Sequence, residues 1–442
     1  MPQQEIVARV RAAGIVGAGG AGFPTHVKLA AAIDTYIVNG AECEPLLYKD
    51  KELMRLYAAR LVHGLQLAQE ATGARRAVIA IKEKYHDALD ALHGAAAGKP
   101  IEFRLFGNFY PAGDEYVIVH EVTGRLIPPG GIPLQVGAAV NNVETLINVS
   151  LAQEGVPVTL KALTVAGAVA EPSSFVVPLG ISAGEVLALA GGATVPDPVL
   201  LEGGAMMGRV VTDLSRPVTK TTGGYIVLPA DHGLIRRKTA PDAAKVRISR
   251  SACDQCSLCT ELCPRYLLGY GIEPHKVMRA VGFAGEQEAG WNQLGLLCCE
   301  CSLCDLYSCP ESLPPKDMCI RAKRSLTAGG QKPALPQGLG HVHPLQEARR
   351  VPVPRLIHRL DLTPYDVPAP LVERPYEPAV VRLLLKQHVG APCRPLVPVG
   401  AAVTAGTPVA DVGEGQLGAR LHASIDGIVS EIDGESLWIR RA

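Results

Sequence analysis

The chain has 442 residues, and its 43 lysines and arginines balance 43 aspartates and glutamates, so that the net charge is zero. This length exceeds what one compact core usually holds and predicts about three domains, or four if some are small. The neutral balance argues against nucleic acid as the main partner. No uncharged run of 18 apolar residues occurs, so we expect no transmembrane segment and a cytoplasmic location.

Five glycines lie between residues 14 and 22, in the stretch GIVGAGGAGFPTHVKLA, and a helix-like pattern follows from Thr25. Glycine lets backbone N–H groups approach a phosphate or a ring closely, and a helix N-terminus favours an anion. The spacing does not match a dinucleotide fingerprint, and no lysine stands where a Walker-type loop needs it. Taken alone, the stretch fits a flexible loop as well as a ligand site.

Short buried strands alternate with helical patterns over residues 1–155. The strands YIVNG and RAVIAIK, at residues 36–40 and 76–82, flank one helical pattern over residues 53–72. This alternation predicts an α/β layered domain. The motifs NGAECEP, YPAGDE and VNNVET are expected at strand ends, where ligand sites in open α/β sheets gather.

Residues 156–235 carry short β-rich runs punctuated by glycine and proline, with one helix expected around AGEVLALA. The pattern predicts a small β domain. Its role is either that of a spacer or that of a ligand contact.

Nine of the twelve cysteines lie between Cys253 and Cys309, which is unlike the scattered pairs of a disulfide framework and indicates a reducing compartment. The first group, CDQCSLCTELCP, has the spacing C-x2-C-x2-C-x3-C followed by proline, as in bacterial ferredoxins. In that run the fourth cysteine ligates a second cluster. A second group, CCECSLCDLYSCP, is present and supplies the cysteines that such a cluster needs.

The ferredoxin rule predicts two 4Fe-4S clusters with crossed ligands. One set is Cys253, Cys256, Cys259 and Cys309, and the other is Cys263, Cys298, Cys301 and Cys304. The second group has four residues rather than three before its last cysteine, which leaves the crossing open. Cys299 could replace Cys298, although only Cys298 keeps the two-residue spacing to Cys301.

Structural zinc is the competing interpretation, but zinc sites usually combine two separated C-x2-C pairs. The 34 residues between the two groups contain helix-like patterns around Val277 and Leu294. We therefore expect a helical module over residues 240–330. Cys43, Cys319 and Cys393 are expected to be buried small side chains rather than ligands.

Residues 331–378 hold ten prolines and are expected to form an extended linker arm with one short helix. Residues 379–442 alternate strands with turns, as a small barrel or sandwich does.

The motifs GAGGAGFPTHVK, NGAECEP, YPAGDE and VNNVET, in this order, resemble the flavin-binding domain of the NADH-oxidising subunit of complex I and of RnfC-type electron-transport subunits. Nearly the whole chain is similar to the cobalamin reductases of propanediol-utilisation microcompartments. The resemblance implies a multidomain α/β + β fold. Its parts are an FMN- and NADH-binding α/β domain, a soluble-ligand-binding β-grasp domain, a helical ferredoxin-like domain with two 4Fe-4S clusters, and an RnfC-like barrel-sandwich hybrid.

The resemblance also implies which residues bind the cofactors. FMN would be held by Gly17, Gly19, Gly20, Lys28, Asn39, Glu42, Tyr110, Gly113, Asp114, Asn141, Asn142 and Thr145. Phe23, Glu44 and Glu115 would touch the nicotinamide nucleotide, with Glu44 and Glu115 as catalytic residues. The chain has GRLIPPGGIPLQVGA where complex I relatives have an aromatic-rich basic loop, a departure that concerns the nucleotide rather than FMN.

The implied activity is that of a flavo-iron-sulfur reductase that passes electrons from NADH through FMN and two clusters to cobalamin. Its implied partners are cobalamin or a corrinoid adenosyltransferase, with microcompartment shell proteins or other redox subunits beside them, and its implied location is the cytoplasm or a bacterial microcompartment. One alternative is an RnfC-type subunit that exchanges electrons between NADH and a ferredoxin-like partner. Another is a docking component that holds clusters but no flavin.

The C-terminal segment also resembles biotinyl and lipoyl carriers, but it has ASIDGIV where those carriers place their lysine. A swinging arm is therefore excluded, and packing or docking is expected. His388 and His422 are candidate ligands for a cobalt ion, although lone histidines are more often structural.

Overall fold

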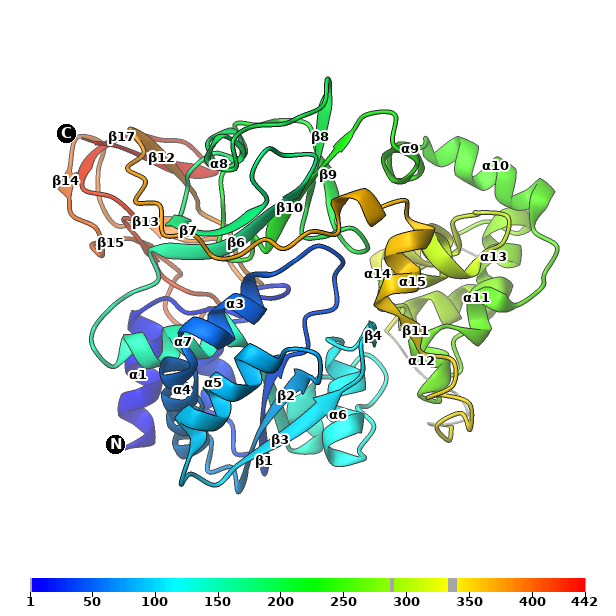
Figure 1. The fold of residues 1–442 in the computed structure, drawn as a ribbon, viewed down its shortest axis with the longest axis horizontal. Coiled ribbons are helices and arrows are strands. Elements are labelled where there is room, and N and C mark those ends of the chain that lie inside the picture. The colour runs from blue at the N-terminus through cyan, green and yellow to red at the C-terminus, as the bar shows by residue number, and fades with distance from the viewer. Residues whose placement is uncertain (1, 287–289, 333–339, 442) are drawn as a thin grey trace.

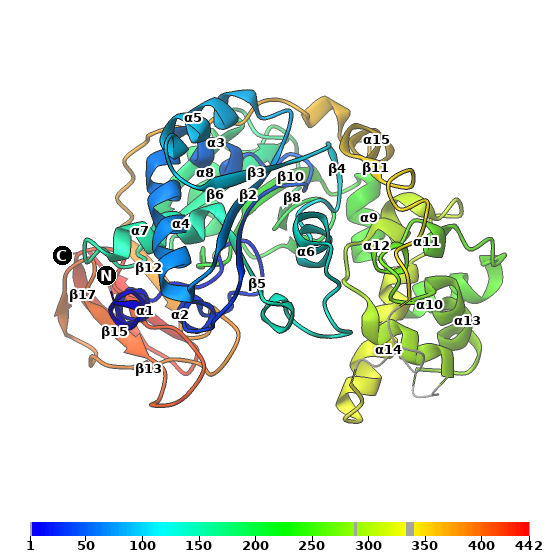
Figure 2. The same cartoon turned by 90° about the horizontal axis from the view of Figure 1, so that it is seen from below.

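The computed structural model describes residues 2–286, 290–332 and 340–441. Its ribbon divides into four packed units, which we call the N-terminal unit (residues 2–152), the middle unit (160–229), the cysteine-rich unit (233–328) and the C-terminal unit (380–440) (Figure 1). The cysteine-rich and C-terminal units lie at opposite ends of the molecule in both views (Figure 2). No helix in the described ranges has the length and apolar character needed to cross a bilayer.

The N-terminal unit is built on a parallel sheet of strand order β3-β2-β1-β5. Its strands are β1 (Thr35–Gly40), β2 (Arg76–Lys82), β3 (Ile101–Phe106) and β5 (Ala138–Asn142). Strands β1 and β2 are apolar runs buried almost throughout, as a parallel sheet covered on both faces requires. The expected strands at residues 36–40 and 76–82 are thus confirmed.

Helices cover both faces of this sheet: α1 (Gln3–Ala12), α2 (Thr25–Leu29), α3 (Lys49–Leu56), α4 (Ala58–Thr72), α5 (His86–Ala96), α6 (Glu115–Thr123) and α7 (Val143–Ala152). Figure 2 shows α4 and α5 on one face and α6 on the other, beside the cysteine-rich unit. The single helix expected over residues 53–72 is wrong, because Tyr57 has φ −116° and ψ 29° and separates α3 from α4.

The strand register brings two of the polar motifs together. Asn39, near the end of β1, lies opposite Asn142 at the end of β5. Helix α7 begins directly after β5, because the side chain of Asn142 accepts a hydrogen bond from Glu144 N at 3.0 Å and caps the helix. The carboxyl edge of the sheet therefore collects residues from both motifs.

The middle unit is a mixed sheet of order β7-β6-β10-β8-β9 with one helix. The elements are β6 (Leu160–Gly167), β7 (Ser173–Pro178), α8 (Ala183–Leu189), β8 (Pro198–Glu202), β9 (Arg209–Val211) and β10 (Gly224–Pro229). Helix α8 is the one expected around AGEVLALA. It begins with a capping box between Ser182 and Glu185.

The cysteine-rich unit is helical. It contains α9 (Gly233–Thr239), α10 (Asp242–Ala252), α11 (Leu258–Glu261), α12 (Pro264–Leu267), α13 (Pro274–Phe283), the 3₁₀ segment η2 (Gly290–Leu297), the π-helical turn η3 (Cys304–Ser308) and α14 (Pro315–Ala328). The pattern around Val277 forms α13, whereas the pattern around Leu294 forms the 3₁₀ segment instead of an α-helix. The nine clustered cysteines lie at helix ends and in the connecting loops, whereas Cys319 lies within α14.

The described part of the proline-rich arm contacts three other units, beginning with the cysteine-rich unit, where Gly340 N donates to Gly269 O at 3.0 Å. Strand β11 (Val351–Pro352) pairs with β4 (Phe109–Tyr110), followed by α15 (Val353–Arg359) and the short η4 (Thr363–Tyr365). Further along, Leu371 bridges to Ser174 at the edge of β7. The arm thus connects the cysteine-rich unit with the N-terminal and middle units before the chain enters the C-terminal unit (Figure 1).

The C-terminal unit contains two small sheets, of order β12-β18-β17-β14 and β13-β15-β16. Their strands are β12 (Val380–Leu384), β13 (Arg394–Pro395), β14 (Ala402–Val403), β15 (Pro408–Asp411), β16 (Leu421–His422), β17 (Gly427–Ile432) and β18 (Ser436–Arg440). Its buried apolar residues share one core with those of α1 and α4.

Candidate functional site

A cavity of about 260 Å³ opens at the carboxyl edge of the parallel sheet. Ten of the residues expected to bind FMN or nucleotide line it: Gly17, Gly19, Gly20, Phe23, Lys28, Asn39, Gly113, Glu115, Asn141 and Asn142. They come from all four motifs that carry the resemblance. The four motifs are far apart in the sequence, and the fold brings them together around one cavity.

The glycine-rich loop forms one wall of this cavity. Gly17 N donates to Phe23 O at 3.0 Å and closes the loop, and Ala18 N donates to Thr145 Oγ1 at 3.0 Å. A Cβ atom at Gly19 would lie 2.9 Å from the side-chain nitrogen of Asn142, whereas one at Gly20 would meet no other atom within 4 Å. Gly19 is therefore required by packing, and Gly20 leaves bare backbone beside the cavity.

Lys28 supplies a positive charge inside the cavity. Its amine donates to Val140 O at 2.8 Å, lies 3.5 Å from the Glu115 carboxylate and sits over the Phe23 ring. The Lys28 side chain is 14% exposed and that of Glu115 is 46% exposed. The lysine is thus held at depth, and the glutamate stands at the mouth.

Three asparagines contribute amide groups. Asn39 Nδ2 donates to Gly113 O at 2.9 Å, Asn141 Nδ2 donates to Tyr36 Oη at 2.8 Å, and Asn142 Nδ2 donates to Asp50 Oδ2 at 2.7 Å. Asn141 is 3% exposed. Within the described ranges its Oδ1 atom has no hydrogen-bond partner. A buried acceptor of this kind usually indicates a missing donor.

A buried network of charges supports the glycine loop from behind. It consists of Lys49, Asp50, Glu144 and Lys161. Lys161 Nζ donates to Ala18 O at 3.2 Å and to Glu144 at 2.5 Å, while Lys49 lies 2.6 Å from Asp50 and 3.3 Å from Glu144. Burial lowers the pKa of Lys161 to about 8. The sequence analysis missed these residues, although Asp50 and Glu144 lie in or next to quoted motifs.

The two glutamates of NGAECEP do not line the cavity as far as the structure describes it. Glu42 accepts from the amides of Cys43 and Glu44 at 2.8 and 2.9 Å, and burial raises the pKa of its carboxyl. Glu44 accepts from Met206 N and Met207 N, both at 2.8 Å, and so ties this loop to the middle unit. Burial raises the pKa of Glu44 to about 7.

The cavity residues fit a flavin phosphate and ring. Backbone exposed at Gly20, the amine of Lys28 and the loop glycines form the kind of surface that an anion approaches closely. The unpartnered Asn141 oxygen is an acceptor suited to a hydroxyl or ring N–H donor. These groups would hold FMN.

Tyr110 and Asp114 point toward the cysteine-rich unit. The hydroxyl of Tyr110, which is buried, donates to Cys301 O at 2.7 Å. Both oxygens of Asp114 accept from Arg265, at 2.5 and 3.0 Å, and Arg265 stacks at 3.8 Å on the ring of Tyr116. Arg265 follows Cys263 by two residues and was also missed by the sequence analysis. The cavity and the cysteines are therefore joined through a few side chains.

The cysteines fall into two groups in space. A cavity of about 20 Å³ is lined by Cys253, Cys256, Cys259 and Cys309, together with loop residues such as Leu313. Cys263 is absent from that lining. This is the first set expected from the ferredoxin rule.

Cys263 lies among the cysteines of the second group. Burial raises the pKa of its thiol, and the neighbouring Cys299 and Cys298 raise it further. Cys304 is likewise influenced by Cys298 and Cys263. Cys299 is hydrogen-bonded to Cys301, which lowers the pKa of the Cys299 thiol to about 7. The choice between Cys298 and Cys299 as a ligand stays a prediction.

Within the described ranges no three His, Cys, Asp or Glu side chains converge as the ligands of one metal ion do. In a 4Fe-4S cluster the four cysteines are spread around the cluster. The two groups could hold such clusters.

His388 and His422 belong to the C-terminal unit, which lies at the end of the molecule opposite the cysteine-rich unit (Figure 2). Both are buried, and His388 Nε2 accepts from Ala419 N at 3.1 Å. Burial lowers the pKa of His422 to about 3. These contacts support a structural role.

Three family models match the chain. Residues 10–151 match the Nuo51 FMN-binding domain, residues 252–314 match a 4Fe-4S dicluster domain, and residues 369–438 match the RnfC barrel sandwich hybrid domain. The matched segments contain the cavity, both cysteine groups and the C-terminal sheets. The flavin, iron-sulfur and barrel-sandwich parts of the expected architecture are thereby confirmed.

Curated relatives match along the whole chain. Two proteins named cobalamin reductase PduS, from Citrobacter freundii and Salmonella typhimurium, are 47% and 48% identical over 99% of this chain and over 97% and 96% of their own lengths. A component of the proton-translocating ferredoxin:NAD(+) oxidoreductase complex of Clostridium ljungdahlii is 33% identical over 60% of this chain and 56% of its own length. The resemblance stated from the motifs is confirmed.

Among solved structures, an NAD⁺-reducing [NiFe]-hydrogenase in its air-oxidized state aligns with 82% of this chain at 24% identity and a TM-score of 0.49. The same enzyme in its H₂-reduced state aligns at 22% identity with a TM-score of 0.48, and this chain spans 63% of that chain's length.

Proposed function

The chain belongs to the cobalamin reductase PduS family, and on that premise we propose that it passes electrons from NADH through FMN and two 4Fe-4S clusters to cobalamin. It is a flavo-iron-sulfur oxidoreductase. The number of clusters, the donor NADH and the individual ligands are part of the proposal.

One contact supports this function above all. Gly113 and Glu115 line the N-terminal cavity, and Asp114 between them is bonded to Arg265, two residues after Cys263. The proposed two-electron site and the proposed one-electron site would thus be linked through Asp114 and Arg265. FMN supplies the exchange between a hydride and single electrons when it is bound.

The described residues have separate roles in this proposal. Lys28 and the glycine loop bind and orient FMN, and the Asn141 oxygen accepts one of its donors. Phe23 and Glu115, at the cavity wall and mouth, face the nicotinamide nucleotide. Glu44 is proposed to act on the nucleotide only indirectly, because its carboxylate is engaged by Met206 and Met207.

The two cysteine groups differ in their surroundings, which suggests an order. In the group around Cys263 and Cys301, Cys301 O accepts from Tyr110, and Arg265, two residues after Cys263, is bonded to Asp114. The group around Cys253 includes the exposed Cys256. Electrons are therefore expected to enter through the first of these groups and to leave through the second.

The middle unit is proposed to be a soluble-ligand-binding β-grasp domain, in line with its mixed sheet and single helix. Corrinoid adenosyltransferases, shell proteins and other redox subunits remain proposed partners. A cytoplasmic or microcompartment location likewise remains a prediction.

Gly20→Ala tests the flavin part of the proposal, because Gly20 lines the cavity and a methyl group there would meet no other atom of the chain within 4 Å. We expect protein purified without oxygen to contain one FMN and about eight irons per chain. Gly20→Ala should keep the iron and lose most of the FMN. Gly94→Ala, on the surface of α5 with no neighbour within 4 Å, should keep both.

Reduction of hydroxocobalamin by NADH under the same conditions tests the overall activity. A visible spectrum of cob(II)alamin is the expected result. Purified protein that contains zinc but no sulfide, or iron but no flavin, would contradict the proposal.

A further inference from the structure

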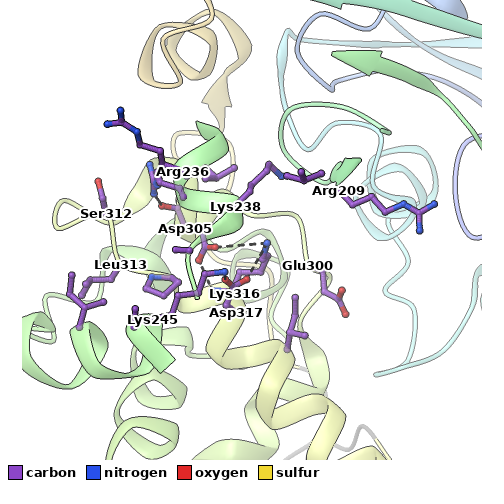
Figure 3. A pocket seen from close by; sticks show the side chains of 18 of the residues that line it. Arg209, Arg236, Lys238, Lys245, Glu300, Asp305, Ser312, Leu313, Lys316 and Asp317 are labelled. Atoms are coloured by element: carbon purple, nitrogen blue, oxygen red, sulfur yellow. Dashed lines mark hydrogen bonds and ion pairs between the residues drawn. The ribbon is translucent and has the colours of Figure 1, made fainter. Parts of the chain in front are cut away.

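A cavity of about 1110 Å³ lies between the middle unit and the cysteine-rich unit (Figure 3). Its walls come from β9, α9, α10, the loop before α14 and α14 itself. This volume reaches the upper end of the range for small-molecule pockets, which suits a ligand of cofactor size. We call it the basic cleft.

Positive charges dominate the basic cleft. Three carboxylates line it, Glu300, Asp305 and Asp317, against eight cationic side chains: Arg209, Arg236, Arg237, Lys238, Lys245, Arg247, Lys316 and Arg324. A cleft lined by one sign of charge attracts ligands of the opposite sign.

The carboxylates of the basic cleft are already engaged. Asp317 lies 2.6 Å from Lys245, Asp305 accepts from Lys316 N at 2.7 Å, and Glu300 lies 2.8 Å from Lys323. By contrast, Arg236, Arg247 and Arg324 are exposed, and their guanidinium groups form no hydrogen bond or ion pair with any residue that the structure describes. Three arginines are therefore free to bind an anion.

The wall near α9 is fixed in place. Lys238 Nζ donates to Met206 O at 3.0 Å and to Gly208 O at 2.7 Å, and Arg237 donates to Asp305 O. Figure 3 shows Lys238, Lys316 and Asp305 close together in the cleft. Burial, followed by the charge of Lys316, lowers the pKa of Lys238 to about 8. An anion in the cleft would relieve this crowding of cations.

The basic cleft adjoins the cysteine group that contains the exposed Cys256. Leu313 lines both the cleft and the small cavity formed by Cys253, Cys256, Cys259 and Cys309. The backbone amide of Leu313 donates to the sulfur of Cys309 at 3.3 Å. A ligand in the cleft would thus be separated from this cysteine group by a single residue.

Apolar side chains also reach the cleft. Met207 is 57% exposed and Ile248 is 50% exposed. Together with the free arginines they suit a ligand that has both an apolar ring and an anionic group.

We propose that the basic cleft binds the electron acceptor as a corrinoid, with its nucleotide-loop phosphodiester bound by the free arginines and its ring against Met207 and Ile248. This inference rests on the proposed function and adds the place of the acceptor to it. Each transfer gives one electron to the Co(III) of aquacobalamin, the protonated form of hydroxocobalamin, to form Co(II), and the upper water ligand leaves the metal. One NADH thus reduces two cob(III)alamins and yields NAD⁺ and one proton.

The test is equilibrium dialysis of hydroxocobalamin against the oxidised, fully loaded protein, without NADH. Arg247→Gln/Arg324→Gln should raise the dissociation constant about tenfold or more, as the loss of charged hydrogen bonds predicts. Arg75→Gln/Arg279→Gln changes the net charge equally, but its exposed residues do not line the cleft, so it should match the wild type. Iron and flavin contents verify that each variant is intact.

Cobinamide lacks the phosphodiester, so its binding measures how much of the affinity for hydroxocobalamin depends on that group. The wild type should bind cobinamide more weakly than hydroxocobalamin, and the cleft variant should bind both alike. Competition by inorganic phosphate in the wild type alone would also support a phosphate site.

Equal binding of hydroxocobalamin by wild type and cleft variant overturns the inference. So does a cleft variant that loses only the reduction of an acidic protein such as a ferredoxin, because the cleft would then be a protein-docking site. If the wild type fails to reduce hydroxocobalamin with NADH, the proposed function itself is wrong. If it succeeds while the variant binds normally, only the placement of the acceptor is wrong.

Discussion

Asp114 is the residue through which the N-terminal cavity and the cysteines are joined. Its Oδ1 atom accepts from Tyr116 N at 3.0 Å and caps α6, and both its oxygens accept from Arg265. Arg265 is 7% exposed, so its charge is compensated almost entirely by this carboxylate. The contribution of the Asp114–Arg265 pair to stability therefore depends on both side chains being charged.

Asp114→Asn should destabilise the protein by about 3 kcal/mol, because it leaves a buried guanidinium without its counter-charge. We expect a clear fall in the thermal unfolding temperature of the loaded protein, measured without oxygen. Asp242→Asn is the matched control. Asp242 also pairs with an arginine, Arg321, but its side chain is 73% exposed, and such a pair contributes about 1 kcal/mol or less. Equal shifts in both variants would contradict the role of Asp114.

The raised pKa of Glu44 predicts that the free energy of unfolding of the protein depends on pH. Its pKa is raised from 4.5 to about 7 by burial, so the folded protein binds this proton more tightly than the unfolded chain. The resulting stabilisation is fully present below the unfolded value and is lost as the pH rises through about 7.

Between about pH 5 and 8 the wild type should therefore lose stability relative to Glu44→Gln, whose amide does not titrate. Thermal unfolding of both proteins across this range measures the difference. Glu414→Gln, at an exposed turn, should show a difference from wild type that stays constant with pH. A constant difference for Glu44→Gln as well would disprove the assignment.

At the scale of the elements, the predicted crossing of the cluster ligands agrees with the way the chain after η3 returns to α11. Cys309 reaches the cavity lined by Cys253, Cys256 and Cys259, whereas Cys263, at the start of α12, lies with the second group. The second cysteine group has four residues rather than three before its last cysteine, and these four residues form part of the π-helical turn Cys304–Ser308.

Pairwise substitutions test this crossing. Cys253→Ala/Cys309→Ala should remove one cluster and leave about four irons per chain, because both cysteines serve the same cluster. Cys253→Ala/Cys263→Ala should remove both clusters. Iron and sulfide analysis with electron paramagnetic resonance distinguishes the variants. If Cys253→Ala/Cys263→Ala instead retains four irons and Cys253→Ala/Cys309→Ala retains fewer, each cluster is ligated by the cysteines of one sequence group and the ligands do not cross.

The sequence predicted two of the four strands of the parallel sheet, β1 and β2, together with the helix around Val277 and the glycine loop, because each depends on local periodicity or on backbone freedom. It did not predict the break at Tyr57 or the 3₁₀ segment around Leu294, where packing overrides a helical pattern. Tyr110 and Asp114 were expected to bind FMN, and that role stays a prediction. Their contacts with Cys301 and Arg265, more than 150 residues away, depend on tertiary packing that no local pattern encodes.

At the scale of the whole molecule, the C-terminal unit supports the glycine loop. Lys220 of the middle unit is 2% exposed, and its amine donates to Gly14 O at 2.7 Å and to Arg420 O at 2.6 Å. A Cβ atom on Gly22 would lie only 3.0 Å from the Cα atom of His388. The N-terminal, middle and C-terminal units therefore meet behind the cavity, whereas the cysteine-rich unit lies at the end of the molecule opposite the C-terminal unit (Figure 2).

Lys220→Met should weaken FMN binding without affecting the clusters. The substitution leaves the carbonyl oxygens of Gly14 and Arg420 without their donor, at a cost of about 1 to 3 kcal/mol for each buried group. The loop that begins at Gly14 should loosen first, so FMN released per chain should rise on dialysis while the iron content stays unchanged. Lys386→Met, at an exposed position near Gln387 and His388, should retain its flavin. Loss of iron in parallel with flavin would instead mean that Lys220 stabilises the whole molecule, and the C-terminal unit would then have no specific effect on the flavin site.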